Sequence, residues 1–181
     1  MAGTTANVLV GGASQVALAT YISSKVVSLT YTDIGYTMGG VTIDPKVELH
    51  NVEVDQTLVI IAAIPKKRDL EVKMRFAEVH AENLNLLWNS PTTVLTTNGS
   101  TNSTLSLMAS AGEQYYQLRV IGKGTRGAGT RTATFWKAVP KDLGTLLFKK
   151  DDIQGPEVTF MICEDTTGAN TTATFGMIVD T

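Results

Sequence analysis

Apolar and polar residues alternate along two long stretches of the chain, and the first stretch begins at Val41. Apolar residues occupy alternate positions there, at Val41, Ile43, Val47 and Leu49. The intervening polar residues are Thr42, Asp44, Lys46, Glu48 and His50. A period of two predicts a β-strand with one buried face. Pro45 has no N–H to donate to a neighbouring strand, so we expect an edge strand or an interruption there.

The second alternating stretch, residues 70–76, is the clearest in the sequence. Its apolar positions are Leu70, Val72, Met74 and Phe76, and its polar positions are Glu71, Lys73 and Arg75. An apolar run over residues 58–64 precedes it, and the charged segment P-K-K-R-D at 65–69 separates the two. We therefore interpret residues 57–76 as a long hairpin with a basic tip at 65–69.

One segment, at about residues 78–89, has helical periodicity. Its apolar stripe consists of Ala77, Ala81, Leu84 and Trp88, with Leu87 beside it. Glu78 and Glu82, near the start, suit the positive end of the helix dipole. Pro91 and the residue before it end the helix. A single amphipathic helix in a chain of strands must cover a sheet face.

Shorter β-rich segments make up most of the remaining chain. We predict strands at residues 26–31, 104–108, 115–121, 131–139, 157–164 and 175–179. Residues 33–40 contain a glycine-punctuated turn, and residues 92–104, rich in Thr, Asn, Ser and Gly, form a predicted surface loop. The fold class is therefore mainly β, antiparallel, with one α-helix.

Length and composition fit a single globular domain over residues 1–181. The chain has 181 residues, of which 43% are hydrophobic and 18% are charged. A chain of this size buries about 70% of its unfolded surface, which is enough for a sizeable core. Its hydrophobic content and low net charge argue against disorder.

The net charge of -2 limits the classes of partner. A protein that clamps DNA usually carries a strong basic excess, so we do not expect tight nucleic-acid binding by a single copy. No apolar run approaches the roughly 18 residues that span a bilayer, and the first residues lack the basic region of a secretory signal. We therefore expect synthesis in the cytoplasm and no membrane association.

Charged residues are segregated along the sequence. Residues 114–141 contain six basic residues and no acidic one, whereas the chain after Lys150 contains six acidic residues and no basic one. Two interpretations stay open. The two segments form opposite patches for head-to-tail association, or both are solvated loops.

The segment G-K-G-T-R-G-A-G at residues 122–129 has the spacing of a dinucleotide-binding loop. Such a loop must leave a strand and open a helix, so that the helix N-terminus meets the pyrophosphate. Residues 130–139 are strand-like here. We therefore interpret the segment as a hairpin connection between two strands.

Few other residues are candidates for chemistry. His50 and His80, the two histidines, lie on different predicted elements, whereas a metal site needs three or four convergent ligands. Cys163, the one cysteine, cannot form an intrachain disulfide and lies in an apolar strand, where a thiol is inert. We expect no catalytic group, no metal, no cofactor and no enzymatic activity. Trp88 is expected in the core, and the role of Trp136 stays open.

Three motifs follow one another between residues 35 and 84. They are G-Y-T-M-G-G-V-T at 35–42, V-E-V-D-Q at 52–56, and F-A-E-V-H-A-E-N-L at 76–84. With the alternating strand that leads into the third motif, they resemble the major tail tube proteins of long-tailed bacteriophages. The resemblance covers about residues 30–90, and beyond them only the β character is shared. The family often has a glycine or proline after the D-Q pair, where this chain is more apolar.

The resemblance implies an antiparallel β-sandwich or barrel-like subunit with a flanking helix and an extended hairpin arm. It also implies rings of six subunits whose inner strands join into one β-barrel, and a tube of stacked rings through which the genome passes. The implied partners are other copies of the chain and the tape-measure, terminator, and tail-tip or baseplate proteins, with DNA only in transit. The implied location is the phage tail, and no cofactor takes part.

The assembly arm of this subunit is expected at about residues 33–76. Candidates for contacts between subunits or rings are Asp44, Lys46, Glu48, Glu53, Asp55, Gln56, Lys66, Lys67 and Arg68. Candidates for the lumen are Glu71, Lys73 and Arg75, which equally fit a face toward solvent or a neighbour. A β chain with exposed edges must cover them, and closing them against identical neighbours is one solution.

Three other functions remain as alternatives to a tail tube protein. The inner tube of a contractile tail, a tailocin or a secretion-type injection machine needs the same subunit. The loops at 92–104 and 166–174, rich in Thr and Asn, suggest a β-sandwich module that binds carbohydrate or cell-surface ligands. An enzyme that uses a nucleotide through residues 122–129 ranks last.

Overall fold

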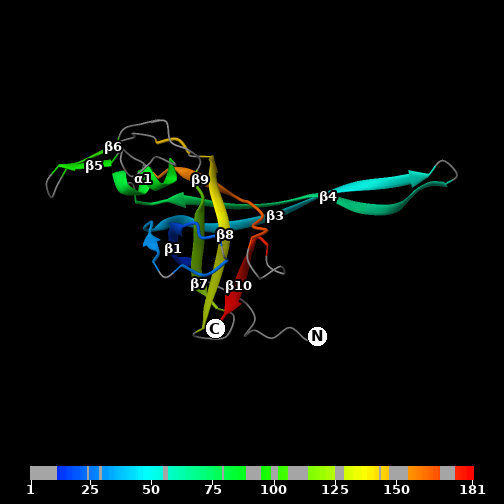
Figure 1. Cartoon of the computed structure of the whole chain (residues 1–181), viewed down its shortest axis with the longest axis horizontal. Helices are drawn as coiled ribbons and strands as arrows, with labels where there is room; N and C mark the ends of the chain where they lie inside the picture. The colour runs from blue at the N-terminus through cyan, green and yellow to red at the C-terminus, as the bar shows by residue number, and fades with distance from the viewer. Residues whose placement is uncertain are drawn as a thin grey trace.

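The protein, described by a computed structural model, is built largely from long strands (Figure 1). The strands are β1 (Ala13–Thr20), β2 (Thr32–Asp33), β3 (Thr37–Val54), β4 (Thr57–Phe76), β5 (Leu95–Asn98), β6 (Asn102–Leu105), β7 (Tyr116–Lys123), β8 (Thr130–Asp142), β9 (Glu157–Ile162) and β10 (Gly176–Asp180). One helix, α1 (Ala81–Leu87), follows β4. The structure describes residues 12–23, 25–28, 30–54, 57–78, 80–88, 95–98, 102–105, 114–124, 129–142, 144–146, 155–167 and 174–181.

Eight of these strands form one antiparallel sheet. Seven lie in the order β2-β1-β7-β8-β9-β4-β3, and β10 is attached to β8. β5 and β6 form a separate two-stranded hairpin. The fold class is therefore mainly antiparallel β, as the sequence predicts, and α1 is the one helix among the described residues.

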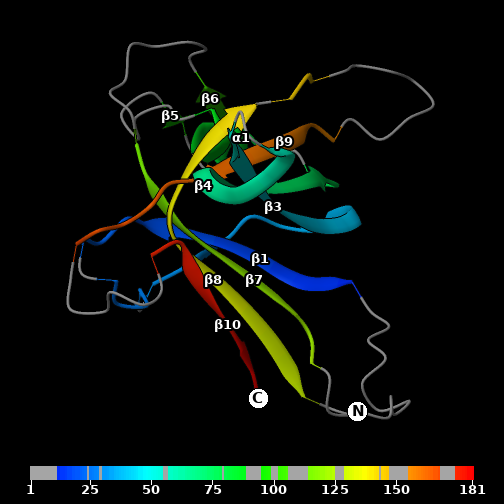
Figure 2. The same ribbon diagram turned by 90° about the vertical axis from the view of Figure 1, so that its right-hand side faces the viewer.

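β8 is the branch point of the sheet, because two strands share one of its edges. Residues 131–135 of β8 pair with β10, and residues 138–142 pair with β9, while β7 pairs along the other edge. Figure 2 shows β1, β7, β8 and β10 side by side in one part of the body, and β9, β4 and β3 in the other. The sheet curls enough to bring β1 near β3, but it is not closed.

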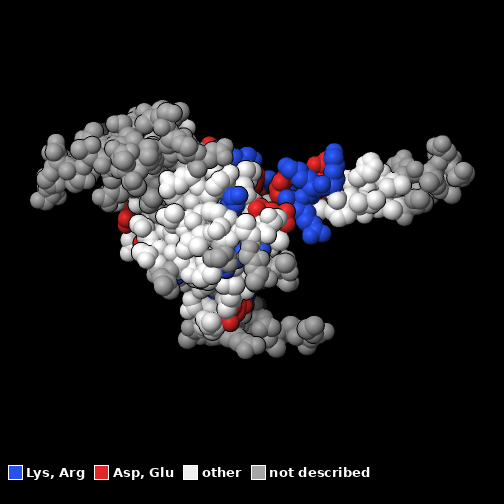
Figure 3. Space-filling view, viewed as in Figure 1, with Lys and Arg blue, Asp and Glu red and all other residues white. Residues whose placement is uncertain are grey.

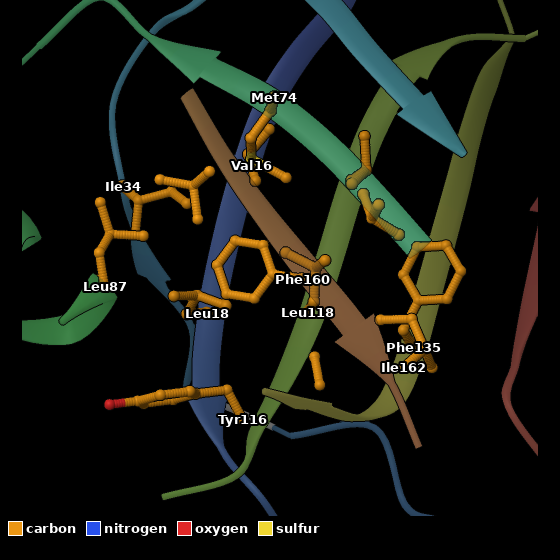
Figure 4. Packing of buried hydrophobic residues seen from close by; sticks show 14 of the residues in the cluster. Val16, Leu18, Ile34, Met74, Leu87, Tyr116, Leu118, Phe135, Phe160 and Ile162 are labelled. Atoms are coloured by element: carbon orange, nitrogen blue, oxygen red, sulfur yellow. The ribbon is translucent and has the colours of Figure 1, made fainter. Parts of the chain in front are cut away.

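The core lies inside this curl and joins strands that are far apart in the sequence (Figure 4). Its most deeply buried side chains include Leu18, Ile34, Val72, Phe76, Leu118 and Phe160. Leu87 of α1 belongs to the same cluster, and Trp88 packs against it. The helix therefore covers one end of the core. Trp136 is also buried.

Most of the predicted strands in the second half of the chain are confirmed, with small shifts of their ends. The predictions at 115–121, 131–139, 157–164 and 175–179 correspond to β7, β8, β9 and β10. The prediction at 104–108 overlaps β6, and residues 106–108 lie outside the described part. The predicted loop at 92–104 is wrong in part, because β5 pairs with β6 there. Its threonines are β-branched and suit a strand.

The helix is shorter than the predicted range of 78–89. It has seven residues, with His80 in an extended conformation as N-cap and Trp88 as C-cap. The N–H of Ala77 donates to the carbonyl of Tyr36, the residue before β3, at 2.8 Å. Backbone pairing between the two segments therefore continues one residue past the end of β4, and the helix begins later than predicted, at Ala81. The predicted apolar stripe is confirmed at Leu84, which is buried, and at Trp88, which packs against the core. Leu87, predicted beside the stripe, is also buried.

The predicted strand at 26–31 is wrong, since its described residues lie outside strands. The fully buried Gln117 of β7 holds this segment in place of a strand ladder. Its amide donates to the carbonyl of Val26 at 3.0 Å, and its Oε1 accepts from the N–H of Ser28 at 2.7 Å and from the hydroxyl of Tyr31. Side-chain hydrogen bonds therefore replace backbone pairing here.

Candidate assembly arm

β3 and β4 form one antiparallel hairpin that leaves the body of the protein (Figure 1). The strands have 18 and 20 residues and pair from Thr37–Phe76 at the base to Val54–Thr57 at the far end. β9 pairs with β4 only over residues 70–75. Beyond that point the hairpin is a two-stranded ribbon, and we call residues 46–54 and 57–69 the arm.

The structure corrects the predicted hairpin at 57–76 with its tip at 65–69. Both halves of that range belong to the single strand β4, whose partner is β3. Leu49 pairs with Pro65 and Glu48 with Lys67, so Lys66 is an extra residue in β4. Such a bulge accommodates a proline that cannot donate to the ladder. The segment lacks the Gly or Asn that favours a tight reversal of the chain.

Gly39 and Gly40 form a second irregularity, at the base of β3. The pairing register shifts by two residues between Met38 and Val41, and the two glycines have φ angles of 77° and 87°. This left-handed region favours glycine. The predicted turn at 33–40 is therefore wrong at Gly39–Gly40, which form a bulge inside the strand. Bulges bend a strand and increase its twist, so this pair sets the direction of the arm.

β3 is an edge strand of the described sheet, as Pro45 predicts. Pro45 pairs with Leu70 and donates no N–H. Residues 45–51 and 62–68 are exposed, so the ribbon is open to solvent on both faces. A long exposed edge strand is a template for contact with another chain.

The apolar face of β3 continues from the core into the arm. Val41 packs against the core, and Ile43, Val47 and Leu49 follow at alternate positions with 36%, 56% and 54% of their surface exposed. The extra residue Lys66 lies on β4, so the alternation of β3 is unbroken over this range. We call Ile43, Val47 and Leu49 the apolar row. Large apolar side chains in a continuous exposed row mark a contact surface.

Glu71, at the base of the arm, joins three strands through ion pairs. Its side chain is 9% exposed and accepts hydrogen bonds from Nζ of Lys141 at 2.6 Å and Nζ of Lys46 at 2.8 Å. These bonds, that of Lys141 first, lower the pKa of Glu71 to about 2. Lys46 lies on β3 and Lys141 on β8, so the pairs fix the arm against the body.

Two residues complete this charged cluster. Nζ of Lys73 lies 3.5 Å from Glu71 and 3.6 Å from Asp44, and Asp44 also lies 3.4 Å from Nζ of Lys46. Asp44 and Glu71 are directly opposite each other in the strand pair. Two like charges at that position would repel, and the lysines compensate.

Further out, the arm carries exposed ion pairs. Nζ of Lys66 lies 3.4 Å from Glu48, and Nζ of Lys67 lies 2.6 Å from Asp69. Arg68 is exposed beside them. Figure 3 shows that Lys and Arg side chains gather on the part of the arm nearest the body. Exposed pairs contribute little to stability, because water screens them, and their charges can be shared with a partner.

The predicted assembly residues therefore divide into groups. Asp44 and Lys46 belong to the cluster around Glu71, whereas Glu48, Lys66, Lys67 and Arg68 lie exposed on the arm. Glu53 lies in β3, but its side chain is not described. Asp55 and Gln56, also predicted to make contacts, lie outside the described residues. The contacts of all these residues with other subunits stay predictions.

The predicted lumen residues alternate with the core residues of β4, as the sequence indicates. Val72 and Met74 are buried, while Lys73 and Arg75 are partly exposed on the other face. Glu71 and Lys73 take part in the charged cluster, and Nε of Arg75 donates to the carbonyl of Gly155 at 3.2 Å. The face they share is polar, and its place in a lumen stays a prediction.

An apolar groove of about 290 Å³ lies beside the base of the arm. Its lining includes Val41 and Ile43 of β3, Val120 of β7, Ala133 of β8 and Ile178 of β10. We call this the β3–β10 groove. Reasoning from the sequence identified the strand that contains Ile178 but missed the groove, because its walls come from strands far apart along the chain.

β10, one wall of the groove, is held to β8 by an ion pair. The guanidinium of Arg131 donates to both carboxylate oxygens of Asp180, at 2.7 Å and 2.8 Å. These residues come from the basic and the acidic segments of the sequence. The basic and acidic segments therefore pair with each other within the chain at this position. The sequence had suggested either patches for head-to-tail association or solvated loops, and neither interpretation included such a pair.

A polar cleft of about 660 Å³ lies near the start of α1. Its lining includes Asp33, Tyr36, Glu78 and His80. Asp33 accepts hydrogen bonds from the amide of Gln15 at 2.8 Å and from the N–H of Gly35 at 3.0 Å. Tyr36 is 72% exposed. The cleft therefore offers carboxylates and an aromatic ring to solvent.

The other residues considered for chemistry lie apart. The N–H of Gly124 donates to the carbonyl of Gly129 at 2.7 Å, which closes a β7–β8 hairpin, as predicted for this glycine-rich segment. His50 lies on the arm, and His80 occupies the N-cap position of α1 without a capping hydrogen bond from its side chain. Cys163 follows β9 and is partly buried.

Among the described residues, no group of three or more His, Cys, Asp or Glu side chains is placed to hold a metal. Within the same ranges, no helix has the length and apolarity to span a bilayer. No protein-family model matches the chain, and no curated protein matches it.

Proposed function

We propose that this protein is a structural subunit that assembles with copies of itself into stacked hexameric rings, which form the tail tube of a long-tailed bacteriophage. The tube conducts the genome during infection. In this proposal the inner strands of six subunits join into one β-barrel, and the protein has no enzymatic activity. Its partners are other copies, the tape-measure and terminator proteins, and the tail tip or baseplate.

The observation that carries the proposal is the arm. A monomer gains little from extending a two-stranded ribbon into water, since an isolated hairpin is marginally stable. This arm also exposes large apolar side chains at Val47 and Leu49 and a row of charges. Such a surface is stabilised when a neighbour covers it.

The open sheet supports the same proposal. β2 and β3 end the described sheet, and the sheet curls without closing. Unpaired edges attract other strands, and identical neighbours in a ring satisfy them without aggregation. The net charge of -2 suits a conduit that DNA must not bind tightly.

Electron microscopy and mass measurement of the purified full-length protein test the proposal. We expect rings with sixfold symmetry, a mass of six subunits, and tubes at high concentration or with tail-assembly partners. Val47→Lys, which adds a charge to the apolar row, should prevent assembly, and His50→Lys on the polar face of β3 is the matched control. A protein that stays monomeric at all concentrations, and forms no tubes even with tail-assembly partners, would contradict the proposal.

The same surfaces suit the inner tube of a contractile tail, a tailocin or a secretion-type injection machine. In that case a sheath protein surrounds the tube. A sheath gene next to the gene for this protein would assign it to the contractile class.

One observation favours a second candidate function, the binding of carbohydrate. The polar cleft combines the exposed ring of Tyr36 with the carboxylates of Asp33 and Glu78, and sugars bind through stacking on aromatic rings and through hydrogen bonds. Saturable binding of the monomer on a glycan array, lost in Tyr36→Ala, would support this function over self-assembly.

A further inference from the structure

The β3–β10 groove and the apolar row share the strand β3. Val41 and Ile43 line the groove, and Val47 and Leu49 continue outward on the same side of the strand. The groove wall formed by β10 also presents Ile178, which is 58% exposed. The molecule therefore has two exposed apolar surfaces that meet at β3, the groove at the base of the hairpin and the row that continues along the arm.

The arm cannot fill the groove of its own chain. β3 and β4 run outward from the body of the protein (Figure 1), and their pairing is maintained from the base to Val54. Bringing Leu49 back to Ile178 would require the hairpin to fold over within a few residues and break this pairing. Contact between the two surfaces must therefore join two molecules.

The chemistry of the two surfaces is matched. The groove is mostly apolar, with Val41, Ile43, Val120, Ala133 and Ile178 along its walls, and its lining also includes Lys123 and Arg131. The arm offers branched aliphatic side chains at the two-residue spacing of a strand. Burial of both surfaces removes apolar area from water, which the described residues of the single chain do not achieve for Val47, Leu49 or Ile178.

We infer that the β3–β10 groove receives the arm of a second copy of this chain, with Val47 and Leu49 of one molecule packed against Ile43 and Ile178 of the next. This inference rests on the proposed self-assembly and specifies its receiving surface. The contact is heterologous, because one molecule supplies the arm and the other supplies the groove. Each molecule keeps a free arm or a free groove, so the contact repeats until a ring closes or a filament grows.

Two charge substitutions test the heterologous contact. Leu49→Asp disables the arm, and Ile178→Asp disables the groove. Both positions are more than half exposed, at 54% and 58%, so both variants should fold. Each alone should raise the concentration needed for assembly about tenfold or more, because a carboxylate would be buried in an apolar contact.

Mixing the two variants separates this contact from other modes of assembly. One intact arm and one intact groove remain in the mixture, so we expect a dimer of one copy of each variant and no larger assembly, measured by light scattering. If each variant assembles like the wild type, the inferred contact is wrong, while the proposed function stands. If the wild-type protein itself never assembles, both are wrong.

A disulfide trap gives a second readout. In a Cys163→Ser background, Leu49→Cys combined with Ile178→Cys should form covalent oligomers under mild oxidation of the assembled protein. His50→Cys with Ile178→Cys is the matched control, since His50 lies next to Leu49 on the opposite face of β3. Equal cross-linking of the two pairs, or none for Leu49, would overturn the inference.

Discussion

The two halves of the β3–β4 hairpin follow one sequence pattern and lie in opposite environments. Near the body, Val72 and Phe76 are completely buried, whereas Val47 and Leu49 in the arm are 56% and 54% exposed. The near half pairs with β9 and faces the core, and no other described strand pairs with the far half. The same alternation thus serves folding in one half and offers a contact surface in the other.

The two halves differ in which chain buries their apolar side chains. In the near half, other strands of the same chain bury these side chains, so burial stabilises the monomer. In the far half, under our proposal, a second copy of the chain buries them, so burial stabilises only the assembly. Substitutions in the two halves should therefore separate folding from assembly.

The largest effect on folding is expected for Phe160→Ala. Phe160 of β9 is completely buried among core residues of several strands, so its removal leaves a cavity and should lower the free energy of unfolding by about 3–5 kcal/mol. Urea unfolding followed by tryptophan fluorescence measures this change. Leu49→Ala is the arm control, and an equal loss of stability in the monomer would contradict the division between the two halves.

A smaller effect is expected for Gln117→Leu, also in the body. The substitution removes the partners of Val26 and Ser28 and should cost about 1–3 kcal/mol. Residues 25–28, where Val26 is already exposed, should then be cleaved faster by protease, which limited proteolysis detects. Gln15→Leu removes an exposed amide bonded to Asp33 and serves as control. Unchanged protease resistance in Gln117→Leu would show that this amide does not hold the segment.

Glu71 lies at the boundary between the two halves, and its effect should depend on pH. Its pKa is lowered from 4.5 to about 2 in the folded protein, so its ion pairs stabilise the fold above about pH 4.5 and are lost as the pH falls toward 2. Glu71→Gln should lower the urea midpoint at pH 6, and the difference from wild type should shrink toward pH 2. A difference that does not depend on pH would indicate a packing effect instead.

The smallest effect on folding is expected for Val47→Ser in the arm. The side chain is exposed in the monomer, so the free energy of unfolding should change by no more than about 0.5 kcal/mol. Assembly, measured by light scattering, should weaken strongly in the same variant. If Val47→Ser lowered the stability of the monomer but left assembly unchanged, the arm would serve folding and not assembly, contrary to our proposal.

Several features of the fold were predictable from local sequence. The alternation at 70–76 identified the buried and polar faces of β4, and Pro45 identified β3 as an edge strand. The glycine-rich segment at 122–129 was correctly interpreted as a hairpin connection, because the residues after it favour a strand. Each of these predictions depends on the conformation of adjacent residues.

The errors came where pairing partners are distant or unusual. The charged segment at 65–69 resembled a turn, but pairing with β3 and a bulge at Lys66 keep it in the strand. The apolar segment at 26–31 resembled a strand, but the side chain of Gln117 takes the place of a backbone partner. The charged cluster escaped notice because Lys141 approaches Glu71 only in the folded chain.

The sequence by itself determined that this protein is mainly β, with an edge strand at Pro45 and alternating faces on the two long strands. Those properties follow from the period of two in the backbone and from the missing N–H of proline, and both are local. Only the tertiary structure decided that β3 pairs with β4 over its full length, that β9 covers one half, and that the other half forms an exposed arm beside a groove. Register and coverage depend on contacts between distant segments, and an alternating pattern is the same whether its apolar face meets the core or another molecule.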